Sequence, residues 1–138
     1  MRYTAAACTL LLLSALTMSP AVAQTRIRIT SDYGMLTATL ADNDAGRALA
    51  RMLPLTLETH DHLRQEKVGT LPRPLPEIAR QRGFQPGTLG IWNSDRFVIY
   101  YVRGEVPNPG IMVVGQVDGT AAIYDRPGSI TVRIERID

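Results

Sequence analysis

The densest group of polar side chains is the run Glu58-Thr59-His60-Asp61-His62, which contains both histidines of the chain. If this run is extended, Glu58, His60 and His62 project to the same side, because side chains alternate along a strand. Imidazole nitrogens and a carboxylate are ligands that zinc and copper accept. The spacing therefore makes Glu58, His60 and His62 a candidate metal site, with a solvated strand end as the alternative interpretation.

A second group combines aromatic rings with arginines: Trp92, Arg96, Tyr101 and Arg103. On one strand, Tyr101 and Arg103 face the same way while Tyr100 faces the opposite way. Aromatic and arginine side chains at a concave barrel mouth would suit a small ligand or a proline-containing peptide. We therefore predict ligand binding by these four residues. The alternative interpretation is that Trp92 and one tyrosine simply fill the core.

Familiar catalytic motifs are missing from the sequence. There is no phosphate-cradling glycine loop and no serine in a nucleophile-elbow motif, and the single cysteine, Cys8, lies near the N-terminus. Glu66 beside Lys67 is interpreted as an ordinary pair of opposite charges in a polar loop from Asp61 to Lys67. The sequence thus predicts no catalytic residue and no cofactor.

The first elements that must position these residues are a hairpin and a helix. Arg26 to Thr30 and Met35 to Leu40 alternate with period two, and the turn Asp32-Tyr33-Gly34 joins them into a predicted β-hairpin. A helix follows, capped by Asp42 or Asn43, with apolar residues at spacings of three and four. Pro54 is expected to stop it.

The rest of the chain reads as short strands separated by turns. Leu55 to His60 is a predicted strand, Leu71 to Pro76 is too rich in proline for a central strand or helix, and Glu77 to Arg82 is expected to form a helical turn. Further strands are predicted at Thr88 to Trp92, Arg96 to Arg103, Ile111 to Val117 and Ser129 to Ile137. The pattern predicts a mainly β fold, a small closed antiparallel β-barrel with one or two short helices, because closure leaves no exposed sheet edge.

The N-terminus has the pattern of a secretory signal peptide. Arg2 precedes an apolar run from Ala5 to Leu16, and Ala21-Val22-Ala23 has the small residues that a signal peptidase requires. The run is too short to span a bilayer and has no polar face typical of a packed helix. We predict a signal peptide at 1–23, a single domain at 24–138, export to the periplasm or the medium, and no membrane association after cleavage.

The charge of the predicted domain is nearly balanced. The chain has 15 Lys and Arg, of which Arg2 belongs to the leader, leaving 14 against 13 Asp and Glu. Proteins dedicated to nucleic acids usually show a clustered basic face. We therefore expect no nucleic-acid partner.

Five segments of the predicted domain form a recognisable series. In order, they are Leu53-Pro54-Leu55-Thr56-Leu57, Glu66-Lys67-Val68-Gly69-Thr70-Leu71-Pro72, Pro86-Gly87-Thr88-Leu89-Gly90-Ile91-Trp92, Phe97-Val98-Ile99-Tyr100-Tyr101 and Val114-Gly115-Gln116-Val117. Together they resemble the bacterial cyclophilin-like fold proteins, from about Ile27 to Val117 and more faintly to the C-terminus. The resemblance implies a small β-barrel with one or two helices packed against its openings.

The resemblance implies less about activity. True cyclophilins isomerise proline bonds with an arginine beside an aromatic and methionine-lined pocket, and their Phe-His-Arg and Gln-Met-Gly type signatures are not found here. The favoured hypothesis is an exported domain that binds a small ligand or peptide without classical isomerase catalysis. The alternatives are a peptidyl-prolyl isomerase acting on exported proteins and a metal-binding protein using Glu58, His60 and His62.

Overall fold

The structure is a computed structural model that describes residues 14–17 and 24–137. Most of the predicted signal peptide, including Cys8 and the Ala21-Val22-Ala23 site, lies outside these residues, so the leader and the export it implies stay predictions. None of the helices in the described ranges has the length and apolar character needed to cross a membrane.

The described residues form short strands, one α-helix and one 3-10 turn. In chain order these are β1 (Arg26–Ser31), β2 (Gly34–Leu40), α1 (Asp44–Met52), β3 (Leu55–His62), β4 (Glu66–Thr70), β5 (Gly83–Phe84), β6 (Thr88–Trp92), β7 (Arg96–Tyr100), β8 (Gly104–Glu105), β9 (Met112–Val117), η1 (Ala122–Tyr124) and β10 (Ile130–Ile137).

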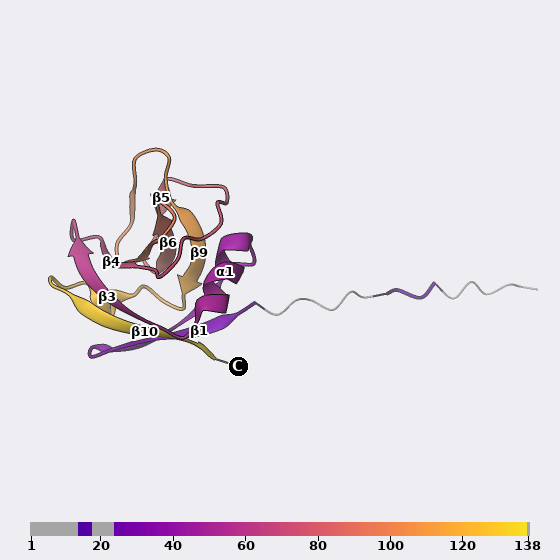
Figure 1. Ribbon diagram of the computed structural model, residues 1–138, viewed down its shortest axis with the longest axis horizontal. Helices are drawn as coiled ribbons and strands as arrows, with labels where there is room; N and C mark the ends of the chain where they lie inside the picture. Colours follow the sequence, from indigo (N-terminus) through magenta and orange to yellow (C-terminus); the bar gives the residue numbers. More distant parts are fainter. Residues whose placement is uncertain (1–13, 18–23, 138) are drawn as a thin grey trace, which may run out of the picture.

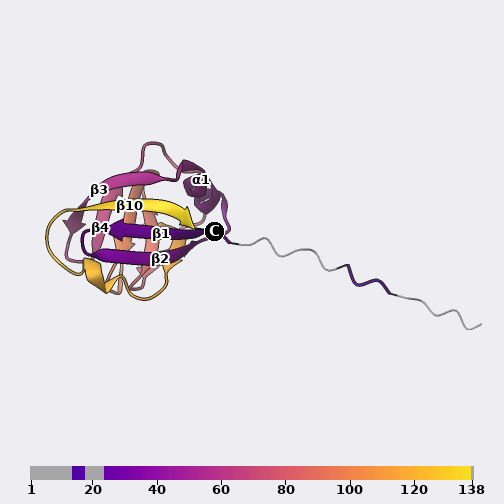
Figure 2. The same ribbon diagram turned by 90° about the horizontal axis from the view of Figure 1, so that it is seen from below.

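The longer strands close into an antiparallel barrel in the order β1-β10-β3-β4-β7-β6-β9-β2. Figure 1 shows the curved sheet with α1 at its side, and Figure 2 shows β3, β10, β1 and β2 lying next to one another on one face. The predicted N-terminal hairpin is present, with Ile29 opposite Leu36. The prediction of a mainly β, closed antiparallel barrel is confirmed.

Every second side chain of the strands points into the barrel interior and fills it. Ile27, Ile29, Val132 and Ile134 are completely buried, while the residues between them are partly or fully exposed. Each buried aliphatic side chain contributes about 1.5–3 kcal/mol relative to an exposed one. The period-two pattern therefore decides which face of each strand points into the core.

Helix α1 packs near one end of the barrel. Asn43 is its cap, since its side-chain oxygen accepts a hydrogen bond from the backbone N–H of Gly46 at 2.8 Å. The same side chain donates to the carbonyl of Val113 at 3.2 Å, and Ala41 N–H donates to the carbonyl of Val114 at 2.7 Å. One side chain thus starts the helix and ties it to β9.

A second apolar core lies outside the barrel, against the outer face of β4, β6 and β7. Its buried members are Val68, Phe84, Val98, Tyr100, Val106 and Ile111. The Phe84 and Tyr100 rings stack with centroids 3.8 Å apart. Two long connections, between β4 and β6 and between β7 and β9, cover this face. They contribute the two-stranded sheet of β5 and β8.

The prediction of a helical turn at Glu77 to Arg82 is wrong, because backbone groups of this segment form hydrogen bonds with a distant segment instead. Gln81 and Ile111 exchange both backbone hydrogen bonds, at 3.0 and 2.8 Å. Gly110 has a φ of +88°, and a Cβ on it would lie 2.4 Å from the carbonyl oxygen of Gln81. This close approach requires glycine and holds the segment extended.

The predicted loop from Asp61 to Lys67 is also wrong in extent. Strand β3 continues to His62, β4 begins at Glu66, and these two residues are paired across the hairpin. Both Glu66 and Lys67 are completely buried, so they are not an ordinary solvated charge pair. At the other boundary, β7 ends at Tyr100 and not at Arg103.

Candidate functional site

A cavity of about 640 Å³ lies between the outer face of the barrel and the connections that cover it. The lining residues come from the end of β3 and the turn after it, the segment before β5, the end of β6 and the turn after it, and β8 with the segment that follows. They are His62, Leu63, Gln65, Glu77, Arg80, Trp92, Asn93, Glu105, Val106, Pro107, Asn108, Pro109 and Gly110. The volume lies within the range of roughly 300–1,000 Å³ that is usual for small-molecule sites.

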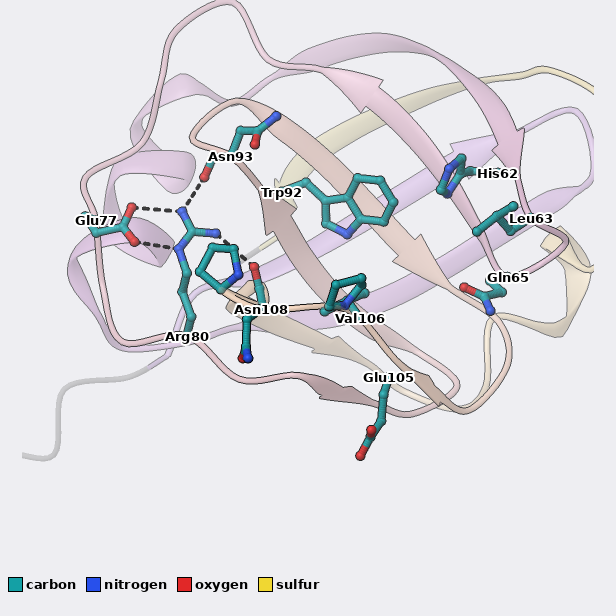
Figure 3. A pocket seen from close by; sticks show the side chains of 13 residues that line it. His62, Leu63, Gln65, Glu77, Arg80, Trp92, Asn93, Glu105, Val106 and Asn108 are labelled. Carbon is teal, nitrogen blue, oxygen red and sulfur yellow. Dashed lines mark hydrogen bonds and ion pairs between the residues drawn. The ribbon is translucent and has the colours of Figure 1, made fainter.

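Trp92 forms the middle of one wall, between Arg80 at one end and His62 at the other (Figure 3). Its indole N–H donates to the hydroxyl of Tyr100 at 2.9 Å, and the His62 ring meets it edge to face with centroids 4.7 Å apart. Burial raises the pKa of Tyr100, which keeps this hydroxyl neutral. The tryptophan ring is therefore held in a fixed orientation beside the cavity.

A buried carboxyl group stands behind His62. Oε1 of Glu66 lies 2.7 Å from Nδ1 of His62, and Glu66 is completely buried. Its other oxygen, Oε2, has no hydrogen-bond partner among the described residues. Burial raises the pKa of Glu66, although the hydrogen bond with His62 opposes this. The elevated pKa favours the protonated form of the Glu66 carboxyl group.

The protonation state of this pair decides what His62 offers to the cavity. Because Nδ1 is engaged with Glu66, Nε2 is the ring nitrogen that a ligand could reach. When Glu66 is ionised and His62 is neutral, Nε2 accepts a hydrogen bond. When the pair holds one more proton, Nε2–H donates. His62 can thus offer the cavity either a hydrogen-bond acceptor or a hydrogen-bond donor.

Arg80 stabilises the other end of the cavity. Its guanidinium donates to both carboxylate oxygens of Glu77, at 2.5 and 2.9 Å, and to the carbonyls of Asn93 at 2.5 Å and Gly110 at 3.1 Å. These bonds join three connections around the cavity. Most of the guanidinium donors are therefore occupied, and Arg80 is a positioning residue.

On the inner side of the same strands lies a separate charged network. Nζ of Lys67 donates to Asp61 and Gly128 at 2.9 Å each and also to the carbonyl of Arg126. The Tyr101 hydroxyl donates to the same Asp61 oxygen at 2.6 Å. Burial would raise the pKa of Asp61, but the hydrogen bonds from Tyr101 and Lys67 outweigh it and lower the pKa. This network closes one region of the barrel interior and does not line the cavity.

The predicted ligand set of Trp92, Arg96, Tyr101 and Arg103 is not brought together. Trp92 lines the cavity, whereas Tyr101 is buried in the barrel interior. Arg96 is exposed at the start of β7, 3.9 Å from Asp95, and Arg103 is exposed beyond the end of that strand. Tyr100 and Tyr101 do face opposite sides of the sheet, but both are buried. Binding by the four residues as a set stays a prediction.

The candidate metal ligands share one face of β3 but have different neighbours. Glu58 and His60 are exposed, and Glu58 accepts a hydrogen bond from Thr131 at 3.4 Å, while His62 is turned to Glu66. Within 14–17 and 24–137, no three His, Cys, Asp or Glu side chains gather as a metal would require. Metal binding by Glu58, His60 and His62 stays a prediction.

Sequence reasoning missed Glu66, Arg80 and the segment from Val106 to Gly110. A signal for Glu66 did exist: a three-residue turn after His62 pairs it with Glu66, four residues later. For Arg80 there was no local signal, because its partners Asn93 and Gly110 are 13 and 30 residues away. Hydrogen bonds between segments far apart in the sequence therefore bring these parts of the cavity together.

Comparisons with known proteins agree with this architecture. The chain superimposes on the solution structure of a hypothetical protein from Archaeoglobus fulgidus with a TM-score of 0.64 and 16% identity, covering 83% of this chain and 95% of that one. This likeness shows the fold. No curated protein matches the chain. The model of the cyclophilin-like family matches residues 29–135, nearly the whole barrel. The chain therefore belongs to the cyclophilin-like family.

Proposed function

We propose that this domain binds a small, largely apolar ligand or a short proline-containing peptide in the cavity beside Trp92, without classical isomerase catalysis. The observation that carries the proposal is a cavity of about 640 Å³ whose wall combines a fixed indole ring with a histidine backed by a buried carboxyl group. Ligand sites typically pair an apolar lining with a few placed polar groups.

The lining supplies both kinds of contact. Leu63, Val106 and Pro107 present apolar surface, and the Trp92 face can stack on a ring or attract a cation. His62 offers Nε2 as the polar contact, with its ring oriented by Glu66. A ligand with a flat or cyclic apolar body and one hydrogen-bonding group fits this chemistry.

Arg80 argues against an isomerase mechanism of the cyclophilin type. That mechanism relies on an arginine that contacts the carbonyl side of the twisting bond, and Arg80 is the arginine that lines this cavity. Its guanidinium already donates to Glu77, Asn93 and Gly110. Contacting a substrate carbonyl would cost at least one of these bonds. Binding without catalysis is therefore the favoured function.

Trp92 makes the test direct, because it is the only tryptophan of the chain. Its indole N–H gives a single resonance in a ¹⁵N–¹H correlation spectrum, and 2-naphthol and the peptide Ala-Ala-Pro-Phe serve as probes. We expect a saturable shift of that resonance with either probe, and the same shift in Met35→Ala, which changes an exposed residue outside the cavity. No shift with either probe would overturn the proposal.

The isomerase alternative is tested by measuring the rate of proline isomerisation in the same peptide. Uncatalysed proline isomerisation takes tens of seconds or longer, so even weak catalysis is visible. We expect the rate of cis to trans exchange to equal that in buffer. A rate that rises with protein concentration would favour the isomerase instead.

We also propose that this binding takes place outside the cytoplasm. It rests on the N-terminal pattern of Arg2, an apolar run and Ala21-Val22-Ala23. The expected product is a chain beginning at Gln24, found by mass spectrometry in a periplasmic extract or the medium. An intact chain confined to the cytoplasm would contradict it.

A further inference from the structure

Leu63 occupies an unusual position at the cavity. It lines the cavity directly after His62, whose ring contacts Trp92, yet Leu63 is 72% exposed. A single exposed leucine is ordinary on a protein surface. The place of Leu63 at the cavity and its backbone conformation are what set it apart.

The backbone at this leucine is strained. The β3–β4 turn has a φ of +53° at Leu63 and +55° at Arg64. The backbone N–H of Gln65 donates the turn hydrogen bond to the backbone carbonyl of His62 at 3.0 Å. Positive φ at both central residues is typical of type I′ turns, which strongly prefer Asn-Gly. A bulky residue with positive φ is an outlier. Across the cavity, Asn93 also has a positive φ of +52°, but asparagine tolerates it well.

Arg64 holds the strained turn in place. Its guanidinium donates to the Tyr101 hydroxyl at 3.0 Å and pairs with Asp61 at 3.3 Å and with Asp125 at 2.9 Å. These contacts attach the turn to the buried network inside the barrel and to the segment after η1. The turn is thereby over-determined, which is the condition under which strained residues persist, often at functional sites.

We propose that Leu63 is a ligand-contacting, specificity-determining residue, held over the cavity by the Arg64 contacts at a cost in stability. The inference rests on the proposed function, because it assumes that the cavity takes a ligand. An apolar group of that ligand would pack against Leu63 and Trp92 together. This contact would account for a leucine in a turn that asparagine or glycine would suit better.

Three variants test the inference: Leu63→Asn, Leu63→Ala and Met35→Ala. Leu63→Asn suits positive φ and should raise the melting temperature by about 3 °C. Leu63→Ala removes the apolar side chain without relieving the strain. Met35→Ala is the matched control, since Met35 is 56% exposed on β2 and does not line the cavity.

Binding of 2-naphthol, followed at the Trp92 indole resonance, supplies the second measurement. We expect both Leu63 variants to weaken binding by about fivefold or more, and Met35→Ala to leave it unchanged. Unchanged binding in the Leu63 variants would overturn the inference while leaving the proposed function standing, and so would a lower melting temperature of Leu63→Asn. If the unmodified protein binds no probe, the proposed function fails, and this inference with it.

Discussion

Glu66 and Lys67 are neighbours on one strand, yet they belong to two different regions of the molecule. Both are completely buried. Lys67 points into the barrel, where Asp61 and two backbone carbonyls accept hydrogen bonds from its ammonium group. Glu66 points out towards the cavity, where His62 holds one of its oxygens and the other is unpartnered in the described structure.

The two faces of the sheet therefore differ in how completely their buried charges are paired. Buried charges stabilise a fold only when they are well paired, because leaving a charge unpaired in the interior costs several kcal/mol. The inner network satisfies this condition. The outer pair does not, and incomplete pairing next to a cavity is typical of functional sites.

The largest expected effect tests the inner region. Lys67→Ala removes the ammonium partner of the partly buried Asp61 carboxylate and the donor to two backbone carbonyls. It should destabilise the fold by about 3–5 kcal/mol, measured by urea denaturation. As the control, Arg133→Ala removes a half-exposed arginine of β10 and should change stability by less than about 0.5 kcal/mol. A loss below about 1 kcal/mol in Lys67→Ala would show that the network contributes little.

Glu66→Gln tests the outer region and should stabilise the fold, whereas Lys67→Ala destabilises it. The pKa of Glu66 is raised in the fold, so its contribution to stability is present at acidic pH and is lost as the pH rises through the folded pKa. Glutamine carries no charge. The variant should therefore be more stable than the unmodified protein by about 1 kcal/mol at pH 8.

The pH profile of the same variant sharpens this prediction. Below about pH 4 both side chains are neutral, so the difference in unfolding free energy should shrink towards zero. A variant that is less stable than the unmodified protein at pH 8 would show that pairing with His62 outweighs the cost of burying the carboxylate.

Tyr100→Phe should have an effect of about the same size as Glu66→Gln but of the opposite sign, because it removes one hydrogen bond between neutral groups. The indole N–H of Trp92 would lose its acceptor while the stacking on Phe84 is kept. The expected loss is about 1 kcal/mol, with a change in the Trp92 indole resonance. An unchanged resonance would contradict the fixed orientation of that ring.

Equimolar zinc or copper is expected to give the smallest effect. His62 is engaged by Glu66, which separates it from Glu58 and His60, so the melting temperature should change by less than about 1 °C. A clear rise that His60→Ala abolishes would instead confirm the metal site predicted from the sequence.

Much of the fold could be predicted from local patterns. The alternation in Arg26 to Thr30 identified a strand with one buried face, and the spacing of Ala45, Ala48 and Leu49 identified the helix. Both signals are local, because a side chain's direction follows from the period of its own element. The candidate site was less predictable. Of the residues chosen from the sequence, Trp92 and His62 line the cavity. The residues next to them in the sequence give no signal of this position.

By itself, the sequence determined the helix, the closed barrel and its strands except β4, since hydrophobic periodicity and turn residues act over a few positions. Only the tertiary structure decided that Glu66 and Lys67 are buried on opposite faces and that Gln81 pairs with Ile111. The physical reason is distance along the chain. The cavity forms when segments up to 30 residues apart, such as those of Arg80 and Gly110, exchange hydrogen bonds that no local pattern specifies.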